Sequence, residues 1–536
     1  MRVVPWADPR DLQDRLFAAL SAMFAAEVPL YGGALSVNDL CNAAAVALLE
    51  RRFPALGTVA GRHRELGAER HGAIRIGRPD EYRWVGRLFA CFGMEPHGFY
   101  DMTSVGAKRQ PIIATAFRSR IRPEHRMFCS LLVPDAFPAA TRCRVEEALA
   151  TRDVFGDDAR GLVEKHEAQG GLDDGDGEQL IAQCVGRIFA WSGRGGPLDL
   201  YRELVDADMR IAADIACFPS HHLNHLAFNA VAIDLFTAAM RRCLGERDRT
   251  WFRDRATAVL GELAGRADAD LVRLLLPHAP EELGAPAVPS AAAIAAIVDG
   301  LDQRLDDDRC ALHRLPHAGF KESTEGPPAD VPILLRQDSY RALTETVTFT
   351  TATGHPCPGT HTARFGEVEQ RGYACSAAGR RTYDACLAAA SFAPLGGDAA
   401  TLFARGLILG RYRPTVRGLA ARRAGEELPT TLPALLAAGY VAREPLRYED
   451  FLPVSAAGIF ASNLRQSGGG IGAVPATPRT AAELEAILGR AIVDPVRADE
   501  ATEAQSLRDS LLALGVVSPA GSADAARGGG RDDGRE

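Results

Sequence analysis

The sequence predicts an α+β protein, because segments with helical periodicity alternate with short segments rich in β-branched residues. Apolar residues recur at helical spacing over 9–26 and again through 230–304, as in amphipathic helices. Short runs at 70–77, 112–117 and 359–372 instead carry the β-branched and aromatic residues typical of strands. With 536 residues the chain exceeds what one hydrophobic core usually supports, so two or three lobes are expected.

Composition excludes several classes of protein. Hydrophobic residues make up 47% of the chain, charged residues 24%, and the net charge is -8. These values are typical of a soluble globular protein and argue against nucleic-acid binding. No run of about 18 apolar residues is visible, and the N-terminal segment turns polar too early for a signal peptide, so we expect no membrane partner and a cytoplasmic location. Eleven cysteines without a CxxC pair indicate buried free thiols.

The N-terminal part of the chain is predicted to be mainly helical. Helices are expected at 9–26, at 37–53 and at 80–92, with the first two separated by a break at Tyr31-Gly32-Gly33. After the strands at 112–117 and 127–132, helical spacing resumes from about 143 to 210.

From residue 230 onward the chain becomes rich in Ala, Arg, Leu and Asp, and no cluster of chemically suggestive side chains is visible there. We predict an inserted helical subdomain here, serving as a lid or a contact between subunits. The predicted parts are 1–229, with N-terminal helices and the first part of a β core; 230–321, the inserted subdomain; 322–515, the rest of the β core with C-terminal helices; and 516–536, a disordered tail.

The segment 359–372 places polar side chains on one face of a predicted strand. Because strand side chains alternate with period 2, one face receives His361, Ala363, Phe365, Glu367 and Glu369, while Arg364 lies on the other. A carboxylate taken out of water is tolerated mainly when it is paired or bound to a metal, so this face indicates part of a metal site. A solvent-facing polar strand or a buried Glu–Arg pair is the alternative.

Two further segments carry histidine. In the strand 70–77, His71 and Arg75 share a face, which suits a metal ligand beside an arginine that holds a carboxylate, although a charged strand edge fits too. Three histidines, His221, His222 and His225, lie within five residues, and a strand would separate His222 from the other two. Two histidine strands and one carboxylate strand can supply the facial triad of non-haem Fe(II) enzymes.

These segments resemble the 2-oxoadipate dioxygenase/decarboxylases of the vicinal oxygen chelate superfamily. The matching motifs are Tyr31-Gly32 with Val37-Asn38, 69–75, Leu223-Asn224-His225-Leu226, 325–328, 334–337, 359–372 and 448–453. The resemblance implies a curved β-sheet core surrounded by helices. It implies that His71, His225 and Glu369 bind the metal, with Glu367 as the rival of Glu369. It also places Arg75 on a substrate carboxylate, Val454 and Ser455 beside the substrate, and His361, Arg364 and Glu367 around the ligands, and it gives His221 and His222 no role.

The resemblance further implies that Fe(2+) and O2 convert 2-oxoadipate into 2-hydroxyglutarate and CO2, a step of lysine breakdown. Two departures affect the substrate: Ala227-Phe228-Asn229 replaces the family's usual Thr-Pro-Arg, and the 230–321 block has no counterpart in shorter members. A different 2-oxo acid is therefore an open alternative. An O2-independent metal-dependent lyase or isomerase and a catalytically silent binding protein are two further alternatives.

Overall fold

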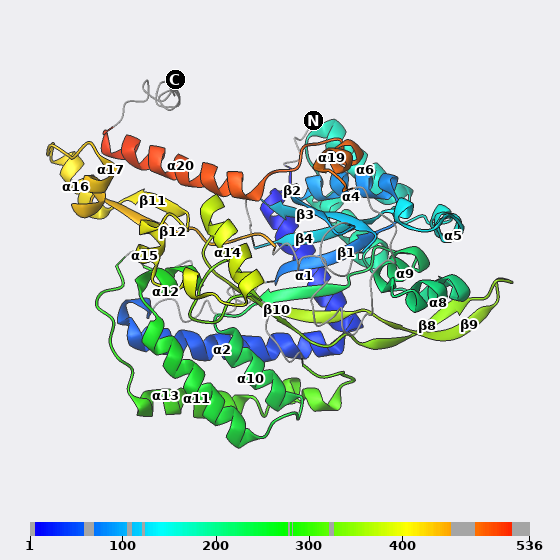
Figure 1. Ribbon diagram of the computed structural model, residues 1–536, viewed down its shortest axis with the longest axis horizontal. Helices are drawn as coiled ribbons and strands as arrows, with labels where there is room; N and C mark the ends of the chain where they lie inside the picture. The colour runs from blue at the N-terminus through cyan, green and yellow to red at the C-terminus, as the bar shows by residue number, and fades with distance from the viewer. Residues whose placement is uncertain are drawn as a thin grey trace, which may run out of the picture. The chain divides into compact units, whose positions relative to one another are not determined.

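The chain forms two compact units (Figure 1). The computed structural model describes residues 6–57, 69–103, 110–119, 124–276, 279–280, 282–320, 326–451 and 478–516. The first unit comprises 1–327, 335–371 and 449–494, and the second comprises 328–334, 372–448 and 495–536. The helices of the predicted insertion belong to the first unit, and its status as an insertion stays a prediction. The predicted disordered tail lies almost wholly outside the described residues.

Two helices open the first unit, α1 (Pro9–Glu27) and α2 (Pro29–Arg52). The predicted break at Gly32-Gly33 is wrong, because α2 already starts at Pro29 and continues through both glycines. Proline at the first helical position is favoured, since its missing N–H needs no partner there. Gly33 lies so close to Leu312 that an added Cβ would stand 2.2 Å from its side chain, which explains a small residue inside this helix.

Helix α2 is long and apolar enough to cross a membrane, judged by length and composition alone, so the expectation that no such segment exists was too strong. More than half of its most apolar stretch is buried in the first unit. Its buried Asn38 and Asn42 both donate to the Asn229 carbonyl, at 3.0 and 3.3 Å. These contacts are those of a core helix, which satisfies buried polar groups inside the protein.

The central sheet of the first unit is mixed and has seven described strands in the order β2-β3-β4-β1-β6-β10-β7. Its strands are β1 (Glu69–Ile76), β2 (Met94–Asp101), β3 (Ile112–Ser119), β4 (Arg126–Leu132), β6 (His225–Asn229), β7 (Leu335–Ser339) and β10 (Phe365–Arg371). The predicted strands at 70–77, 112–117 and 127–132 are thus confirmed. The coarse expectation of an α+β fold is confirmed as well.

The sheet is built from two related halves. In the first half, β1 leads through α4 (Pro79–Cys91) into the antiparallel strands β2, β3 and β4, and β4 returns parallel to β1. In the second half, β6 leads into α10 (Ile233–Cys243), and β10 later returns parallel to β6 with β7 antiparallel at its outer side. The halves meet where β1 and β6 pair antiparallel. The starting strands of both halves therefore lie next to each other.

The predicted strand 359–372 is in fact two strands in two sheets. His361 lies in β9 (Pro356–Thr362), which joins β5 (Arg194–Pro197) and β8 (Thr344–Thr350) in a three-stranded sheet, whereas β10 starts at Phe365. Between them the Arg364 guanidinium pairs with Glu27 and Glu345. This buried arginine fixes the point where the chain passes from one sheet to the other.

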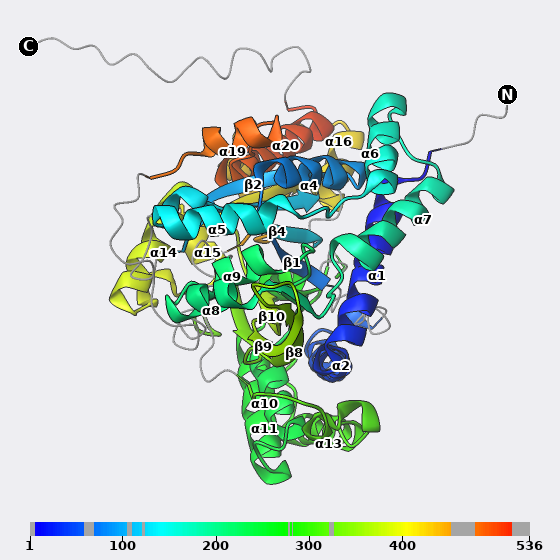
Figure 2. The same cartoon turned by 90° about the vertical axis from the view of Figure 1, so that its right-hand side faces the viewer.

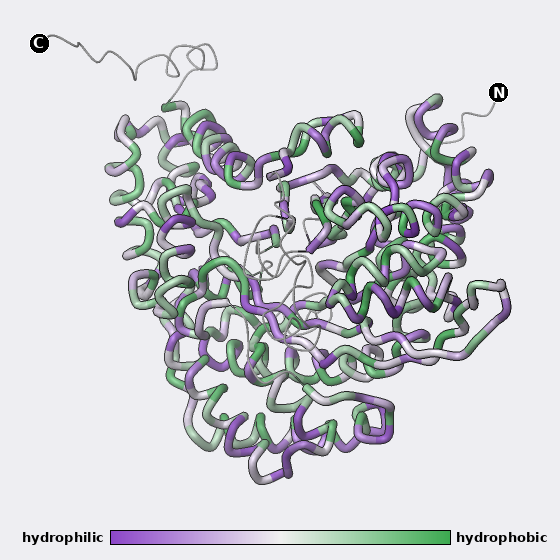
Figure 3. The backbone as a smooth tube through the Cα atoms, turned by 45° about the vertical axis from the view of Figure 1, so that its right-hand side comes forward, coloured by the Kyte–Doolittle hydropathy of each residue, from purple (hydrophilic) through white to green (hydrophobic). Residues whose placement is uncertain are grey.

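Helices surround these sheets (Figure 2). Those between β4 and β6 are α5 (Ala139–Ala150), α6 (Asp157–Gln169), α7 (Asp174–Gln183), α8 (Leu198–Asp206) and α9 (Arg210–Cys217). Side chains of α8 and α9, among them Leu200 and Ile215, share one buried cluster with Phe128 of β4. In Figure 3, apolar and polar stretches alternate along the helices, as expected where one side of each helix is buried.

The predicted helical block is confirmed as helical. It contains α10, α11 (Arg249–Arg266), α12 (Ala269–Leu275) and α13 (Ala291–Arg304). Helices α10, α11 and α13 pack on α2, as Figure 1 shows. All eleven cysteines are free, and Cys143 and Cys357 are the two that are not fully buried.

The second unit is smaller. Its elements are α14 (Ala377–Ala389), α15 (Ala399–Ala404), β11 (Gly410–Pro414), α16 (Val416–Arg423), α17 (Leu432–Ala437), β12 (Val441–Pro445) and α20 (Pro495–Leu514), while α19 (Ala481–Leu488) belongs to the first unit. Strands β11 and β12 form an antiparallel pair that packs against α20. Helix α15 ends at Ala404, and the chain enters β11 at Gly410.

Candidate metal centre

One row of residues crosses the middle of the sheet and brings distant parts of the chain together. Arg126 of β4 is in register with His71 of β1, His71 with Ala227 of β6, and Ala227 with Glu367 of β10. On the neighbouring row, Ala73 is in register with His225, and His225 with Phe365. The small Ala227 side chain leaves the space between His71 and Glu367 open, so side chains from strands two places apart can meet.

His71, His225 and Glu367 each offer one ligand atom, and these atoms lie within 4.8 Å of one another. The Glu367 Oε2 atom lies 3.0 Å from His71 Nε2 and 3.5 Å from His225 Nε2. Ligands about 2.1 Å from a metal at tetrahedral or octahedral angles stand roughly 3.0–3.4 Å apart. The three side chains are almost completely buried, and Glu367 Oε1 has no hydrogen-bond partner in the described chain. This donor set therefore fits a divalent cation.

Glu369 has different partners from Glu367. Its two oxygens accept from the Nε and Nη2 groups of Arg371, both at 2.8 Å, and its Oε1 accepts from Arg126 at 3.0 Å. Its Oε2 lies 2.8 Å from His71 Nδ1. A carboxylate on the far nitrogen of a metal-binding imidazole fixes the tautomer and turns the other nitrogen toward the metal. Glu369 thus holds His71 while Arg371 and Arg126 hold Glu369.

The pKa shifts of the buried groups agree with the different surroundings of Glu367 and Glu369. Burial raises the pKa of Glu369, but Arg371, His71 and Arg126 outweigh it and hold that pKa well below its usual range. Burial lowers the pKa of His225 to about 4, with Arg75 and His71 adding to the shift, so its imidazole is neutral near pH 7. Burial also lowers the pKa of His71, but the nearby Glu369 and Glu367 reverse that shift and raise it overall.

Aromatic rings enclose the centre. The ring of Phe451 stands edge-on to His71 at 4.7 Å between centroids, and Phe365 stacks on His225 at 5.1 Å. The same arginines that hold Glu369 also hold the backbone next to Phe451: Arg126 donates to the Glu449 carbonyl at 2.6 Å, and Arg371 donates to the Asp450 carbonyl. The segment 449–451 is thereby fixed over His71.

Arg75 extends from β1 on the same side as His71. Its guanidinium lies 2.5 Å from Asp214 Oδ2 of α9, and Asn224 also donates to that oxygen, at 2.9 Å. The other oxygen of Asp214 faces His222 and His361, and these three residues form a second group able to hold a cation. His361 is therefore placed beside Asp214 and His222 rather than beside Glu369, because it lies in another sheet.

The remaining predicted site residues lie in different surroundings. Arg364 lies between Glu27 and Glu345, with Trp191 under its guanidinium at 4.9 Å. Val454 and Ser455 lie outside the described residues. His221 pairs with Glu81, with its Nε2 atom 3.4 Å from Oε2.

Three buried charged residues of this region were not identified from the sequence. Arg126 is the one charged residue of a fully buried strand, and Arg371 ends the strand that carries Glu369. Asp214 is the one acidic residue among the buried side chains of α9. A lone charge inside an apolar element needs a buried partner, which is the signal that could have pointed to each of them.

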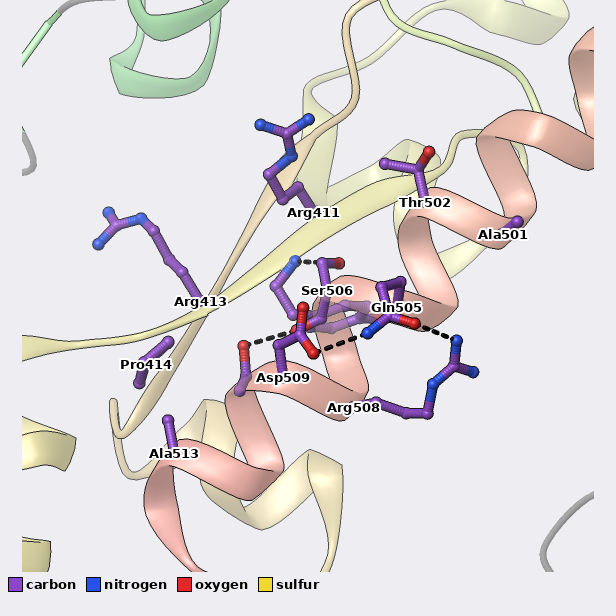
Figure 4. A pocket seen from close by; sticks show the side chains of 12 residues that line it. Arg411, Arg413, Pro414, Ala501, Thr502, Gln505, Ser506, Arg508, Asp509 and Ala513 are labelled. Carbon is purple, nitrogen blue, oxygen red and sulfur yellow. Dashed lines mark hydrogen bonds between the residues drawn. The ribbon is translucent and has the colours of Figure 1, made fainter. Parts of the chain in front are cut away.

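One open groove lies in the second unit (Figure 4). It measures about 800 Å³ between β11 and α20, with Arg411, Arg413 and Asp509 on its walls. Its polar side chains are joined along α20, for example by Gln505 donating to Asp509 at 2.7 Å. This groove is not the candidate metal site, because both buried groups of possible metal ligands lie in the first unit.

The mixed sheet thus brings together two imidazoles and a carboxylate, His71, His225 and Glu367, which could hold one divalent cation. The family model of the 2-oxoadipate dioxygenase/decarboxylases matches residues 16–245 and 298–463, and the chain belongs to this family. A 2-oxoadipate dioxygenase/decarboxylase of Pseudomonas putida is 32% identical over 96% of this chain and 99% of its own length. Its Escherichia coli counterpart is 32% identical over 85% and 88%.

Solved structures agree with this assignment. The hydroxyglutarate synthase of Pseudomonas putida in complex with 2-oxoadipate is 30% identical, covers 95% of this chain and 99% of its own, and has a TM-score of 0.67. A Shigella flexneri protein, YdcJ, is 27% identical with a TM-score of 0.64 and covers 94% of this chain and 99% of its own.

Proposed function

We propose that this protein is an Fe(II)-dependent dioxygenase/decarboxylase that converts 2-oxoadipate and O2 into 2-hydroxyglutarate and CO2. The observation that carries the proposal is the convergence of His71, His225 and Glu367 at one buried point. It occurs in a chain similar over nearly its whole length to a protein named for this reaction. The reaction balances without a further reductant. Cleavage of the C1–C2 bond of the oxo acid supplies two electrons, and hydroxylation of the C–H bond next to the new carboxylate supplies the other two, so that one oxygen atom enters the new carboxylate and the other the hydroxyl group.

We assign the metal to His71, His225 and Glu367. The sequence resemblance implied Glu369 with Glu367 as its rival, and the geometry favours the rival. Glu367 approaches both imidazoles, whereas the oxygens of Glu369 are already held by Arg371, Arg126 and His71. Iron(II) in this position supplies a site at which the oxo acid and O2 come together.

The chain's own residues then bind and orient the substrate. Arg75, on the same side of β1 as His71, is proposed to bind the far carboxylate through two parallel hydrogen bonds. Val454 and Ser455 are proposed to contact the substrate on the segment that follows Phe451. Phe451 and Phe365 keep water from the reacting atoms. We further propose a role in lysine breakdown and a cytoplasmic location, with no nucleic-acid or membrane partner.

The altered 227–229 segment supports the same assignment and leaves the choice of oxo acid open. Ala227 lies between the ligands in register, and Phe228 packs on Tyr31 and Phe236 in the core. Asn229 is in register with Glu369. An arginine here would add a third cation next to Glu369, which already pairs with Arg126 and Arg371. Without it, Glu369 still pairs with two buried guanidiniums.

The test is oxygen consumption by protein loaded with Fe(II) under anaerobic conditions and then mixed with 2-oxoadipate. We expect one O2 consumed for each CO2 released, and loss of both in His71→Ala and His225→Ala variants that keep the wild-type circular dichroism spectrum. A panel of shorter and longer 2-oxo acids would identify the preferred chain length. No oxygen uptake with any member would overturn the proposal.

The departure from Thr-Pro-Arg at 227–229 points to a catalytically silent binding protein. An O2-independent lyase or isomerase on the same site is the other candidate. It predicts turnover that survives strict exclusion of O2 or replacement of iron by Zn(II). Product formation that stops without O2 would exclude it. Tight binding of 2-oxoadipate without turnover would instead indicate a binding protein.

A further inference from the structure

A second group of ligand atoms lies outside the centre described above. Asp214 of α9, His222 and His361 of β9 each offer one atom, and these atoms lie within 4.8 Å of one another. Asp214 Oδ1 is 3.2 Å from His222 Nε2 and 3.0 Å from His361 Nε2. No side chain in the group is more than 3% exposed. The spacing again matches neighbouring ligands of one metal ion, roughly 3.0–3.4 Å.

The three atoms are close without being hydrogen-bonded. Asp214 Oδ1, His222 Nε2 and His361 Nε2 all lack a hydrogen-bond partner of acceptable geometry within the described ranges. An unsatisfied buried polar atom costs about 1–3 kcal/mol, and three at one point are unusual. The three atoms lie within 4.8 Å of one another, so that one cation could contact all of them.

The surroundings prepare the imidazoles for this role. His361 Nδ1 lies 3.0 Å from the Tyr201 hydroxyl, which can accept a hydrogen bond from Nδ1–H and so leave the Nε2 lone pair for a metal. Burial lowers the pKa of His222, so its ring is neutral near pH 7. Trp191 covers both rings, with centroids 4.6 Å from His222 and 5.6 Å from His361.

Neighbouring cations do not exclude a further positive charge. Arg75 and Asn224 use the other oxygen of Asp214, Oδ2, so Oδ1 remains available. Arg364 lies near His222, but Glu27 and Glu345 neutralise it. The carboxylate of Asp214 can therefore serve a guanidinium on one oxygen and a metal on the other.

We propose that Asp214, His222 and His361 form a second binding site for a divalent transition-metal ion, separate from the site made by His71, His225 and Glu367. Two imidazoles and one carboxylate are the donor set of ions such as Zn²⁺ and Co²⁺. The second ion shares Asp214 with Arg75. Through this carboxylate it influences how strongly Arg75 is neutralised, a consequence that rests on the proposed substrate role of Arg75.

The test is the number of Co²⁺ ions bound by the full-length, chelator-stripped protein, measured by equilibrium dialysis and elemental analysis. We expect two ions per chain in the wild type and one in each of His71→Ala and His361→Gln. His221→Ala is the matched control, because His221 is equally buried and adjacent but pairs with Glu81, and it should retain two ions. Co²⁺ at the second site should also quench the fluorescence of Trp191 in wild type and His71→Ala, and not in His361→Gln.

The results separate the two sites. One ion per chain that is kept by His361→Gln and lost in His71→Ala would overturn the second site and leave the proposed function intact. One ion kept by His71→Ala and lost in His361→Gln would support the second site and count against the first. If His361→Gln does not fold, anomalous scattering from Co²⁺ in wild-type crystals decides, and the absence of a peak between Asp214 and His222 would overturn the proposal.

Discussion

Glu367 and Glu369 lie two residues apart on one strand face, yet their partners differ. Glu367 lies close to the imidazoles of His71 and His225. Glu369 instead pairs with the buried Arg126 and Arg371. Without a metal, the buried Glu367 carboxylate adds little to the stability of the fold. The Glu369 carboxylate stabilises the fold through its ion pairs with two guanidiniums. The two positions should therefore respond oppositely when each loses its charge.

We expect Glu367→Gln to lose bound metal with little change in the stability of the metal-free protein. Glu369→Gln should lower the free energy of unfolding by about 3–5 kcal/mol, because it removes the buried carboxylate charge with which both Arg126 and Arg371 pair. Its metal affinity should fall by roughly 10–100-fold, as for other residues that orient a ligand. Urea unfolding of the metal-free variants and metal analysis measure the two effects. The reverse pattern would return the ligand role to Glu369.

Residue identity alone could not separate these roles. Period 2 correctly placed Glu367 and Glu369 on one face, but the register of β10 against β6 and β1 decides which of them meets the imidazoles. The prediction of one continuous strand was wrong at Ala363-Arg364, where the chain passes from one sheet to another. Arg364 pairs there with Glu27, 337 residues away in sequence. Such long-range contacts are absent from a local pattern. For this reason His361 joined Asp214, which sequence analysis did not single out.

At the scale of single elements, Gly366 lets β10 pack tightly against Tyr340. A Cβ on Gly366 would lie 2.0 Å from Cε2 of this fully buried ring. Gly366→Ala should destabilise the protein by about 1–3 kcal/mol through overpacking and should weaken metal binding, since Glu367 is the next residue. Gly261→Ala, in open space on α11, should be neutral or stabilise by up to about 1 kcal/mol. Chemical unfolding of both variants checks the difference, and equal stabilities would contradict it.

The start of α4 carries a pH-dependent contribution. Burial raises the pKa of Glu81, but the hydrogen bond with His221 and the charges of Arg152 and Arg78 outweigh it, and the pKa falls to about 2. The carboxylate also accepts the backbone N–H of Arg78 at 3.1 Å, which caps the helix. Because the folded pKa lies below the unfolded one, the stabilisation is complete above about pH 4.5 and is lost as the pH falls toward 2.

A pKa lowered from 4.5 to about 2 corresponds to roughly 3 kcal/mol at neutral pH. Glu81→Gln should therefore be less stable than wild type at pH 7, and the difference should shrink between pH 4.5 and pH 2.5. Urea midpoints across this range measure it. Glu178→Gln, at an exposed position on α7, is the control and should show no such pH dependence. A difference that is constant with pH would show that Glu81 acts by packing rather than by charge.

At the scale of the whole molecule, both ligand clusters and all four tryptophans belong to the first unit. Tryptophan fluorescence therefore follows the unfolding of the unit that contains both clusters, while calorimetry follows both units. An ion that binds only the folded state stabilises it by about 2.7 kcal/mol at one hundred times its dissociation constant. Metal removal should thus act on one unit.

We expect removal of metal by a chelator to lower the midpoint of thermal unfolding, followed by tryptophan fluorescence, by a few degrees. A free-energy change of this size produces such a shift in a large domain. A calorimetric transition of the second unit, which contains α14 to α17 and α20, should keep its midpoint. Adding Fe(II) or Co(II) should restore the first midpoint, and His71→Ala should reduce the recovery. A shift of both transitions by the same amount would mean that the two units unfold as one, whereas no shift in either would mean that the clusters hold no ion in the folded protein.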